Sequence, residues 1–218
     1  RPWYVAPMVA GEASWSVPYG WIDEDGGSES GTLGIGYGMP YRNAEGQIIG
    51  VVNVDLSLQD ISQFLEQLSI SQNGLVFVMD LDGLMIANSC AAPVVGSDSK
   101  QVAALSLSDP HVASATAHLT ESFSSLADIK EPYEALVTVN GDRCLLIASP
   151  FHHKTGLSWM IVTVVPEADF LAEVQAGGRR SMLVGAAAVV GTVLLGMFVA
   201  AVMIRPIVRL VAHVRHIG

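Results

Sequence analysis

The chain has 218 residues, of which 50% are hydrophobic and 15% charged, and its formal net charge is −10. This length is enough for one or two small domains with hydrophobic cores. All 21 acidic residues but only 6 of the 11 basic ones precede Arg179, which gives that part a net charge of −15. A surface of this sign would repel nucleic acid and anionic lipid, so we expect no nucleic-acid partner.

The first third of the chain is predicted to form an antiparallel sheet. Three segments are rich in β-branched and aromatic residues and are separated by glycine, aspartate and asparagine: 13–22, 31–42 and 48–56. The acidic segment 23–29 is typical of a solvated hairpin tip, because its spacing does not match an EF-hand calcium loop. The glycines Gly34, Gly36 and Gly38 alternate, so they share one face of a strand, where a helix or a ligand can approach closely.

Residues Ser57 to Leu68 predict an amphipathic helix that links this sheet to a second one. Ser57 is a suitable N-cap, and Asp60 lies in the first turn, where the helix dipole favours negative charge. Five apolar residues fall on one predicted face of the helix: Leu58, Ile61, Phe64, Leu65 and Leu68.

The following hundred residues predict a second antiparallel sheet with inserted helices. The predicted strands are 75–80, 84–87, 133–139, 144–149 and 157–165, with tight turns at Asp82-Gly83 and Asn140-Gly141. Residues 99–122 contain helical stretches that Pro110 is predicted to break, and Trp159, Ile161 and Thr163 share one face of the last strand. A further helix is expected to open at Pro166-Glu167. The fold class is therefore α+β with two antiparallel sheets.

The segment Ser181 to Ile204 contains no charged side chain, and Arg205-Pro206 ends it. A bilayer core of about 30 Å requires roughly 20 apolar helical residues, so this run predicts a single transmembrane helix in contact with membrane lipid. Two arginines precede the run and three follow it, which favours a cytoplasmic C-terminus.

Small residues recur every fourth position along this run. They are Ala188, Thr192, Gly196 and Ala200. Such a face permits close packing between membrane helices, so we expect a homodimer formed through the transmembrane helix.

Several segments together resemble the double Cache sensor, a PAS-like extracytoplasmic ligand-binding module of bacterial receptors. The segments that carry the resemblance are Arg1-Pro2-Trp3-Tyr4, Pro18-Tyr19, Gly50 to Ser57 and the hairpin from Gly74 to Ala87. The resemblance covers nearly all of residues 1–180, and residues 205–218 resemble the start of a HAMP linker. The chain begins at Arg1 without methionine, so we expect it to be part of a longer protein.

The resemblance implies a division of the chain into six parts, with two PAS-like sheets of which the first is incomplete. These are the C-terminal part of a membrane-distal subdomain (1–57), a linker helix (58–68), a membrane-proximal subdomain (69–166), a juxtamembrane helix (167–180), the transmembrane helix (181–204) and the start of a HAMP-like linker (205–218). It also implies that residues 1–180 are extracytoplasmic and that the protein lies in the cell membrane.

One subgroup of these sensors binds free amino acids. Carried over residue by residue, the resemblance implies a ligand site of five residues: Arg1, Trp3, Tyr4, Tyr19 and Asp55. The chemistry agrees, because a guanidinium binds a carboxylate through charge-assisted bonds, and a carboxylate beside an aromatic ring can hold an ammonium group. Each residue also has a structural alternative, such as a surface arginine, a core aromatic residue or a helix-capping aspartate.

No catalytic, cofactor or metal motif is evident in the sequence. The pair His152-His153 has no cysteine or carboxylate at zinc-binding spacing and is typical of a solvated loop, and His111 and His118 supply only two nitrogens. Cys90 and Cys144 are too few for a disulfide framework, which leaves a single bridge or two separate thiols. We therefore expect no catalytic residue, cofactor or metal in this chain.

The sequence as a whole favours the sensing and signal-transmitting segment of a transmembrane receptor. Two alternatives stay open. The segment could regulate a membrane-bound enzyme, such as a nucleotide cyclase, histidine kinase or phosphatase, or it could be a passive ectodomain with an anchor. The HAMP-like segment argues against the passive anchor, because an anchor needs no coupling helix.

Overall fold

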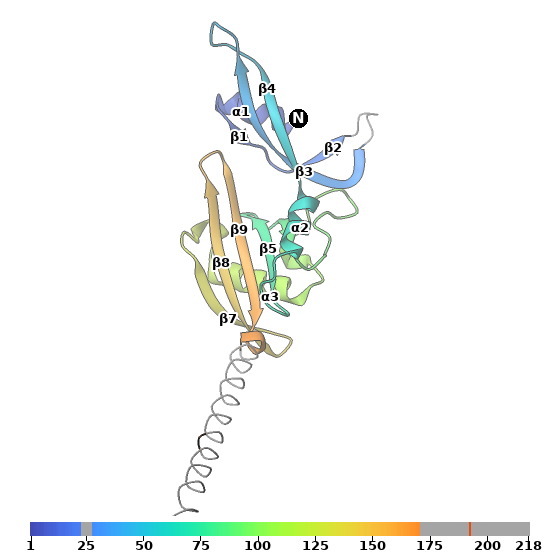
Figure 1. The fold of residues 1–218 in the computed structure, drawn as a ribbon, viewed down its shortest axis with the longest axis vertical. Helices are drawn as coiled ribbons and strands as arrows, with labels where there is room; N and C mark the ends of the chain where they lie inside the picture. The colour runs from blue at the N-terminus through green and yellow to red at the C-terminus, as the bar shows by residue number, and fades with distance from the viewer. Residues whose placement is uncertain (23–27, 171–191, 193–218) are drawn as a thin grey trace, which may run out of the picture. The chain divides into compact units, whose positions relative to one another are not determined.

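The computed structural model describes residues 1–22, 28–170 and 192, and Arg1–Asp169 form one compact unit. This unit contains two antiparallel sheets with few helices, which confirms the predicted α+β class (Figure 1). Among the described residues, no helix is long and apolar enough to cross a membrane. The predicted span 181–204, its small-residue face and the HAMP-like segment lie outside the described residues, apart from Thr192.

The first sheet is built around one long strand. Its strands are β1 (Ser14–Trp15), β2 (Tyr19–Ile22), β3 (Ser28–Arg42) and β4 (Ile48–Ser57). Strand β3 pairs with β1 and β2 along one edge and with β4 along the other, always antiparallel. The single strand predicted at 13–22 was wrong, because β1 and β2 are separate; Pro18, between them, has no N–H for a sheet. Strand β3 also begins three residues before its predicted start at residue 31.

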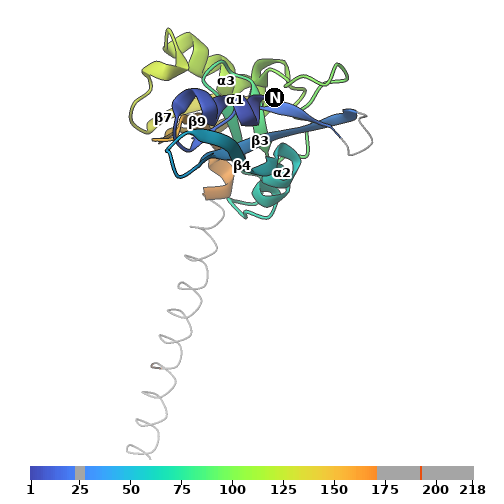
Figure 2. The same cartoon turned by 90° about the horizontal axis from the view of Figure 1, so that it is seen from above.

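A helix that was not predicted from the sequence covers part of this sheet. Helix α1 spans Pro2–Ala10, with a proline at its first position, and ends at Gly11 in the left-handed conformation (φ 69°). The Arg42 guanidinium donates to the Gly11 carbonyl oxygen at 2.8 Å, which ties the helix end to β3. Helix α1 lies against β3 in both views (Figures 1 and 2).

The alternating glycines of β3 make room for this helix. A Cβ atom on Gly36 would lie 2.8 Å from the Trp3 Cβ atom, and one on Gly38 would lie 2.7 Å from the Pro7 Cγ atom. Both distances are too short for unbonded carbon atoms. The predicted close approach to the glycine face is therefore confirmed, and α1 is the element that makes it.

Helix α2 (Leu58–Glu66) follows β4 directly. The Ser57 hydroxyl accepts a hydrogen bond from the Gln59 N–H at 3.1 Å, so the predicted N-cap is confirmed. Of the predicted apolar face, Leu58 and Leu65 are buried, whereas Phe64 is 59% exposed and Leu68 is also exposed. The predicted face was too wide, because only one side of α2 packs, mainly against β6.

The second sheet has five strands in the order β6-β5-β9-β8-β7. They are β5 (Leu75–Asp80), β6 (Met85–Asn88), β7 (Tyr133–Val139), β8 (Asp142–His153) and β9 (Leu157–Pro166). The prediction that Pro110 breaks a helix was wrong, because helix α3 (Pro110–Ser122) starts there. The Asp109 carboxylate caps this helix by accepting hydrogen bonds from the N–H groups of His111 and Val112. Proline suits the first helical position, because an N–H group there would have no acceptor within the helix. Residues 104–106 and 126–128 form short 3-10 turns.

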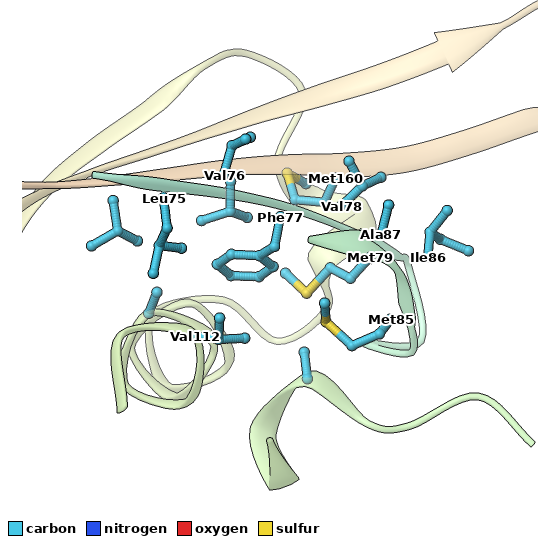
Figure 3. Packing of buried hydrophobic residues seen from close by; sticks show 14 of the residues in the cluster. Leu75, Val76, Phe77, Val78, Met79, Met85, Ile86, Ala87, Val112 and Met160 are labelled. Carbon is cyan, nitrogen blue, oxygen red and sulfur yellow. The ribbon is translucent and has the colours of Figure 1, made fainter. Parts of the chain in front are cut away.

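The main hydrophobic core lies between this second sheet and α3. Phe77 and Met79 of β5 point toward the helix, where Val112 meets them, and all three side chains are fully buried (Figure 3). On β9, Met160 lies on the face that packs into the core. Trp159 lies on the opposite face, which was singled out from the sequence, and that face is only half-buried.

Candidate ligand-binding site

The site begins with the register between β3 and β4. Gly36 lies opposite Asp55 and Gly38 opposite Asn53, so both polar side chains project from the face that the glycines leave bare. A Cβ atom on Gly36 would lie 2.7 Å from Asn53 Oδ1 and 2.9 Å from Asp55 Oδ1. The two polar side chains therefore lean over β3 into space that any larger residue would fill.

Two neighbours hold the Asp55 carboxylate in place. The Tyr19 hydroxyl donates to Asp55 Oδ1, and the Asn53 amide Nδ2 donates to the same oxygen at 2.6 Å. Asp55 Oδ2 has no hydrogen-bond partner within the described part of the chain. Burial, and then the hydrogen bond to Asp55, raise the pKa of Tyr19 above its ordinary value, so the phenol stays a neutral donor.

These side chains face a cavity of about 720 Å³ on the first sheet. The residues that line it are Arg1, Pro2, Trp3, Tyr19, Gly20, Trp21, Val51, Asn53 and Asp55. Four of the five residues predicted from the sequence thus lie around one cavity. Tyr4 does not line it: its ring packs edge-to-face on Trp3, with 5.8 Å between ring centroids, and 40% of the residue is exposed.

Four lining side chains were missed in the sequence: Asn53, Trp21, Val51 and Pro2. Strand periodicity could have found the first three, because Asn53 and Val51 are two and four residues before Asp55, and Trp21 is two after Tyr19. The Trp21 indole lies over Gly34, where a Cβ atom would fall 2.0 Å from Trp21 Nε1. The missing side chain at Gly34 therefore leaves space for the Trp21 ring, and the missing side chain at Gly36 leaves space for Asn53 and Asp55.

The lining carries one cation, one anion and two indole rings. Arg1 forms no ion pair or side-chain hydrogen bond with any described residue, so its guanidinium is available to an anionic group. Asp55 Oδ2 is available to a cationic group. This arrangement suits a small molecule that carries both charges and an apolar part.

The histidines singled out in the sequence lie elsewhere. His152 and His153 are exposed at the end of β8, in a strand and not in the predicted loop, and His118 Nε2 lies 3.2 Å from the Tyr133 hydroxyl. Within the described ranges, no three His, Cys, Asp or Glu side chains are grouped so that they could hold a metal ion. Cys90 and Cys144 are free thiols.

Two antiparallel sheets joined by a short helix, with a cavity that carries both charges on the first sheet, define a two-sheet α+β module with a candidate ligand site. The family model described as a Cache domain matches residues 1–174, which is most of the chain. This protein belongs to the Cache domain family.

The chain is also similar to solved structures, and the two with TM-scores of 0.50 or more share its fold. "Methyl-accepting Chemotaxis protein X" is 19% identical, with a TM-score of 0.53, over 77% of this chain and 55% of its own. The extracellular domain of mmHK1S-Z3, named as a histidine kinase, is 16% identical with a TM-score of 0.50, over 81% and 57% of the two chains. The ligand-binding domain of the Pseudomonas aeruginosa amino acid chemoreceptor PctB, in complex with L-Arg, is 23% identical with a TM-score of 0.46, over 77% and 60%. The chain thus spans less than two thirds of the length of each of these structures.

Proposed function

We propose that this Cache protein is the ligand-sensing segment of a transmembrane receptor and that it binds a free amino acid in the cavity on the first sheet. The observation that carries the proposal is the pair of opposite charges, Arg1 and Asp55, on the lining of one cavity. An α-amino acid has a carboxylate and an ammonium group on the same carbon atom. A cavity with one available guanidinium and one available carboxylate oxygen complements both groups.

Each lining residue has a role in the proposed complex. Arg1 binds the ligand carboxylate, and Asp55 Oδ2 accepts from the ligand ammonium. Tyr19 holds Asp55 through Oδ1 and offers its ring to the cation. Trp3 and Trp21 form apolar walls for the ligand side chain. Tyr4 acts indirectly, by packing its ring against Trp3.

Calorimetry with a panel of the standard L-amino acids tests the binding. At least one should bind the purified protein, and the matching 2-hydroxy acid or decarboxylated amine should bind more weakly. Arg1→Ala and Asp55→Ala should each reduce affinity about 10- to 100-fold, because each removes a charge-assisted contact. The controls Arg143→Ala, on β8, and Asp128→Ala, in the 3-10 turn 126–128, alter exposed residues away from the cavity and should bind as wild type does. Unchanged affinity in both site variants would exclude this cavity as the site.

The proposal extends to the transmission of the signal. In this scheme the receptor has two states that differ in ligand affinity. Ligand binding to the first sheet favours one state and so biases helix α2, the helix expected at 167–180 and then the span predicted at 181–204. In this scheme residues 1–180 are extracytoplasmic, the span pairs with a second copy, and residues 205–218 begin a HAMP-like linker to an output domain. The support is the Cache family membership together with the uncharged run in the sequence.

Single-cysteine labelling in a Cys90→Ala, Cys144→Ala background tests this topology. A cysteine at exposed Glu45 should react with a membrane-impermeant maleimide in intact cells, and one at His216 should react only after permeabilisation. The opposite labelling pattern would overturn the proposed orientation.

A further inference from the structure

We infer that Asn53 is a positioning residue of the binding site, one that fixes the Asp55 carboxylate for the ligand ammonium. This inference rests on the proposed amino-acid function and adds a residue to it. Its basis is the arrangement of Asn53, Tyr19 and Asp55 on the first sheet.

The orientation of the Asn53 amide follows from chemistry. An ionised carboxylate only accepts hydrogen bonds, so the group 2.6 Å from Asp55 Oδ1 must be the Asn53 Nδ2 amide. The Tyr19 hydroxyl donates to the same oxygen. Two donors on Oδ1 fix the carboxylate plane and leave Oδ2 to the ligand.

The carbonyl oxygen of the Asn53 side chain argues against a purely structural role for this residue. Asn53 Oδ1 is buried against Gly36 and has no hydrogen-bond partner among the described residues. A buried acceptor without a partner is unfavourable, so a side chain placed only for stability would be expected to satisfy both ends or to be apolar. Asn53 Nδ2 donates to Asp55, and the Asn53 amide also interacts with Tyr19, whose hydroxyl donates to the same carboxylate. The hydrogen bond from Asn53 therefore holds the Asp55 carboxylate, which we propose binds the ligand ammonium group.

The substitution Asn53→Asp distinguishes positioning from packing. It keeps the size of the side chain but places a second carboxylate beside Asp55. Two adjacent carboxylates disfavour double ionisation, so the pair retains a proton that raises the pKa of one of them. A shared proton weakens the binding of an ammonium group, and this penalty disappears as the pH rises. Asn53→Ala removes the donor without adding charge.

The test is calorimetry of the tightest-binding L-amino acid from the panel, from about pH 6 to about pH 9. Asn53→Ala should weaken binding about 10- to 100-fold with a pH profile parallel to wild type. Asn53→Asp should bind weakly at low pH and recover at high pH. The control Asn43→Asp lies in the turn of the same hairpin, where an aspartate oxygen can still accept from the Gln47 N–H, and it should follow wild type.

The outcomes separate the two proposals. If wild type binds and both Asn53 variants bind equally well with parallel pH profiles, the role of Asn53 is overturned and the proposed function stands. If both variants lose binding by the same factor at every pH, Asn53 serves packing only, which also overturns the inference. If wild type binds no amino acid, both proposals fail.

Discussion

Asn73 donates both its backbone N–H and its side-chain amide to the carboxylate of Asp169, at 2.6 and 2.8 Å. The Ser71 hydroxyl donates to the same carboxylate at 2.7 Å. Asp169 lies in the helical turn after β9, and Ser71 and Asn73 lie in the connection between α2 and β5. Three hydrogen bonds therefore join the connection that follows α2 to the helical turn that follows β9.

The first prediction concerns stability and pH. The hydrogen bonds from Ser71 and Asn73 lower the pKa of Asp169. A carboxylate whose pKa is lower in the folded state stabilises the fold at pH values above the ordinary aspartate pKa of about 3.9. This contribution is lost as the pH falls through the lowered pKa. Asp169→Ala should therefore reduce the free energy of unfolding near neutral pH.

Urea unfolding at about pH 7 and at about pH 3 measures this effect. The difference between wild type and Asp169→Ala should shrink at the lower pH. The control Asp128→Ala, which removes an exposed carboxylate with no side-chain hydrogen bond in the described structure, should match wild type at both. An Asp169→Ala deficit that does not depend on pH would contradict the assigned role of the charge.

The second prediction concerns Gly36. A methyl group there would lie within 3 Å of Trp3, Asn53 and Asp55 at once. Gly36→Ala should therefore displace α1 or the polar cluster and abolish measurable amino-acid binding. The control Gly50→Ala lies on the paired strand β4, where a new Cβ atom meets nothing within 4 Å, and it should bind as wild type does. Calorimetry measures both, and normal binding by Gly36→Ala would refute the close packing at this point.

The third prediction concerns the Tyr19 hydroxyl. Tyr19→Phe keeps the ring but removes one of the two donors on Asp55 Oδ1. Amino-acid affinity should fall about tenfold, in line with the loss of one hydrogen bond to a charged group. Tyr41→Phe, which alters an exposed tyrosine of the same sheet, is the matched control. If both variants bind as wild type does, the hydroxyl has no part in the site.

The fourth prediction compares two phenylalanines. Phe77 is fully buried in the core of the second sheet, whereas Phe64 on α2 is 59% exposed. Phe77→Ala should cost about 3 to 5 kcal/mol of unfolding free energy, from lost burial and the cavity left behind. Phe64→Ala should cost about 1 kcal/mol or less. Urea denaturation measures both, and equal losses would mean that Phe64 is covered in the folded protein.

Local features were predictable where neighbouring residues decide them. The cap at Ser57 and the hairpin around Asn140-Gly141 depend on hydrogen bonds or turn geometry within a few residues, and both are present. The apolar width of α2 was overestimated, because exposure of Phe64 depends on what packs against the helix. Helix α1 was missed because two prolines and a short length weaken its signal, and its contact with Gly36 and Gly38 supports it.

The sequence by itself determined the α+β class and the glycine face of β3, and its resemblance to Cache sensors indicated Arg1, Trp3, Tyr19 and Asp55, whose chemistry suits an amino acid. Strand periodicity and side-chain chemistry are local properties that the order of residues contains. Only the tertiary structure decided that these four side chains share one cavity and that Tyr4 stays outside it. It also revealed Asn53 beside Asp55, because the register of β4 on β3 and the placement of α1 depend on contacts between distant parts of the chain.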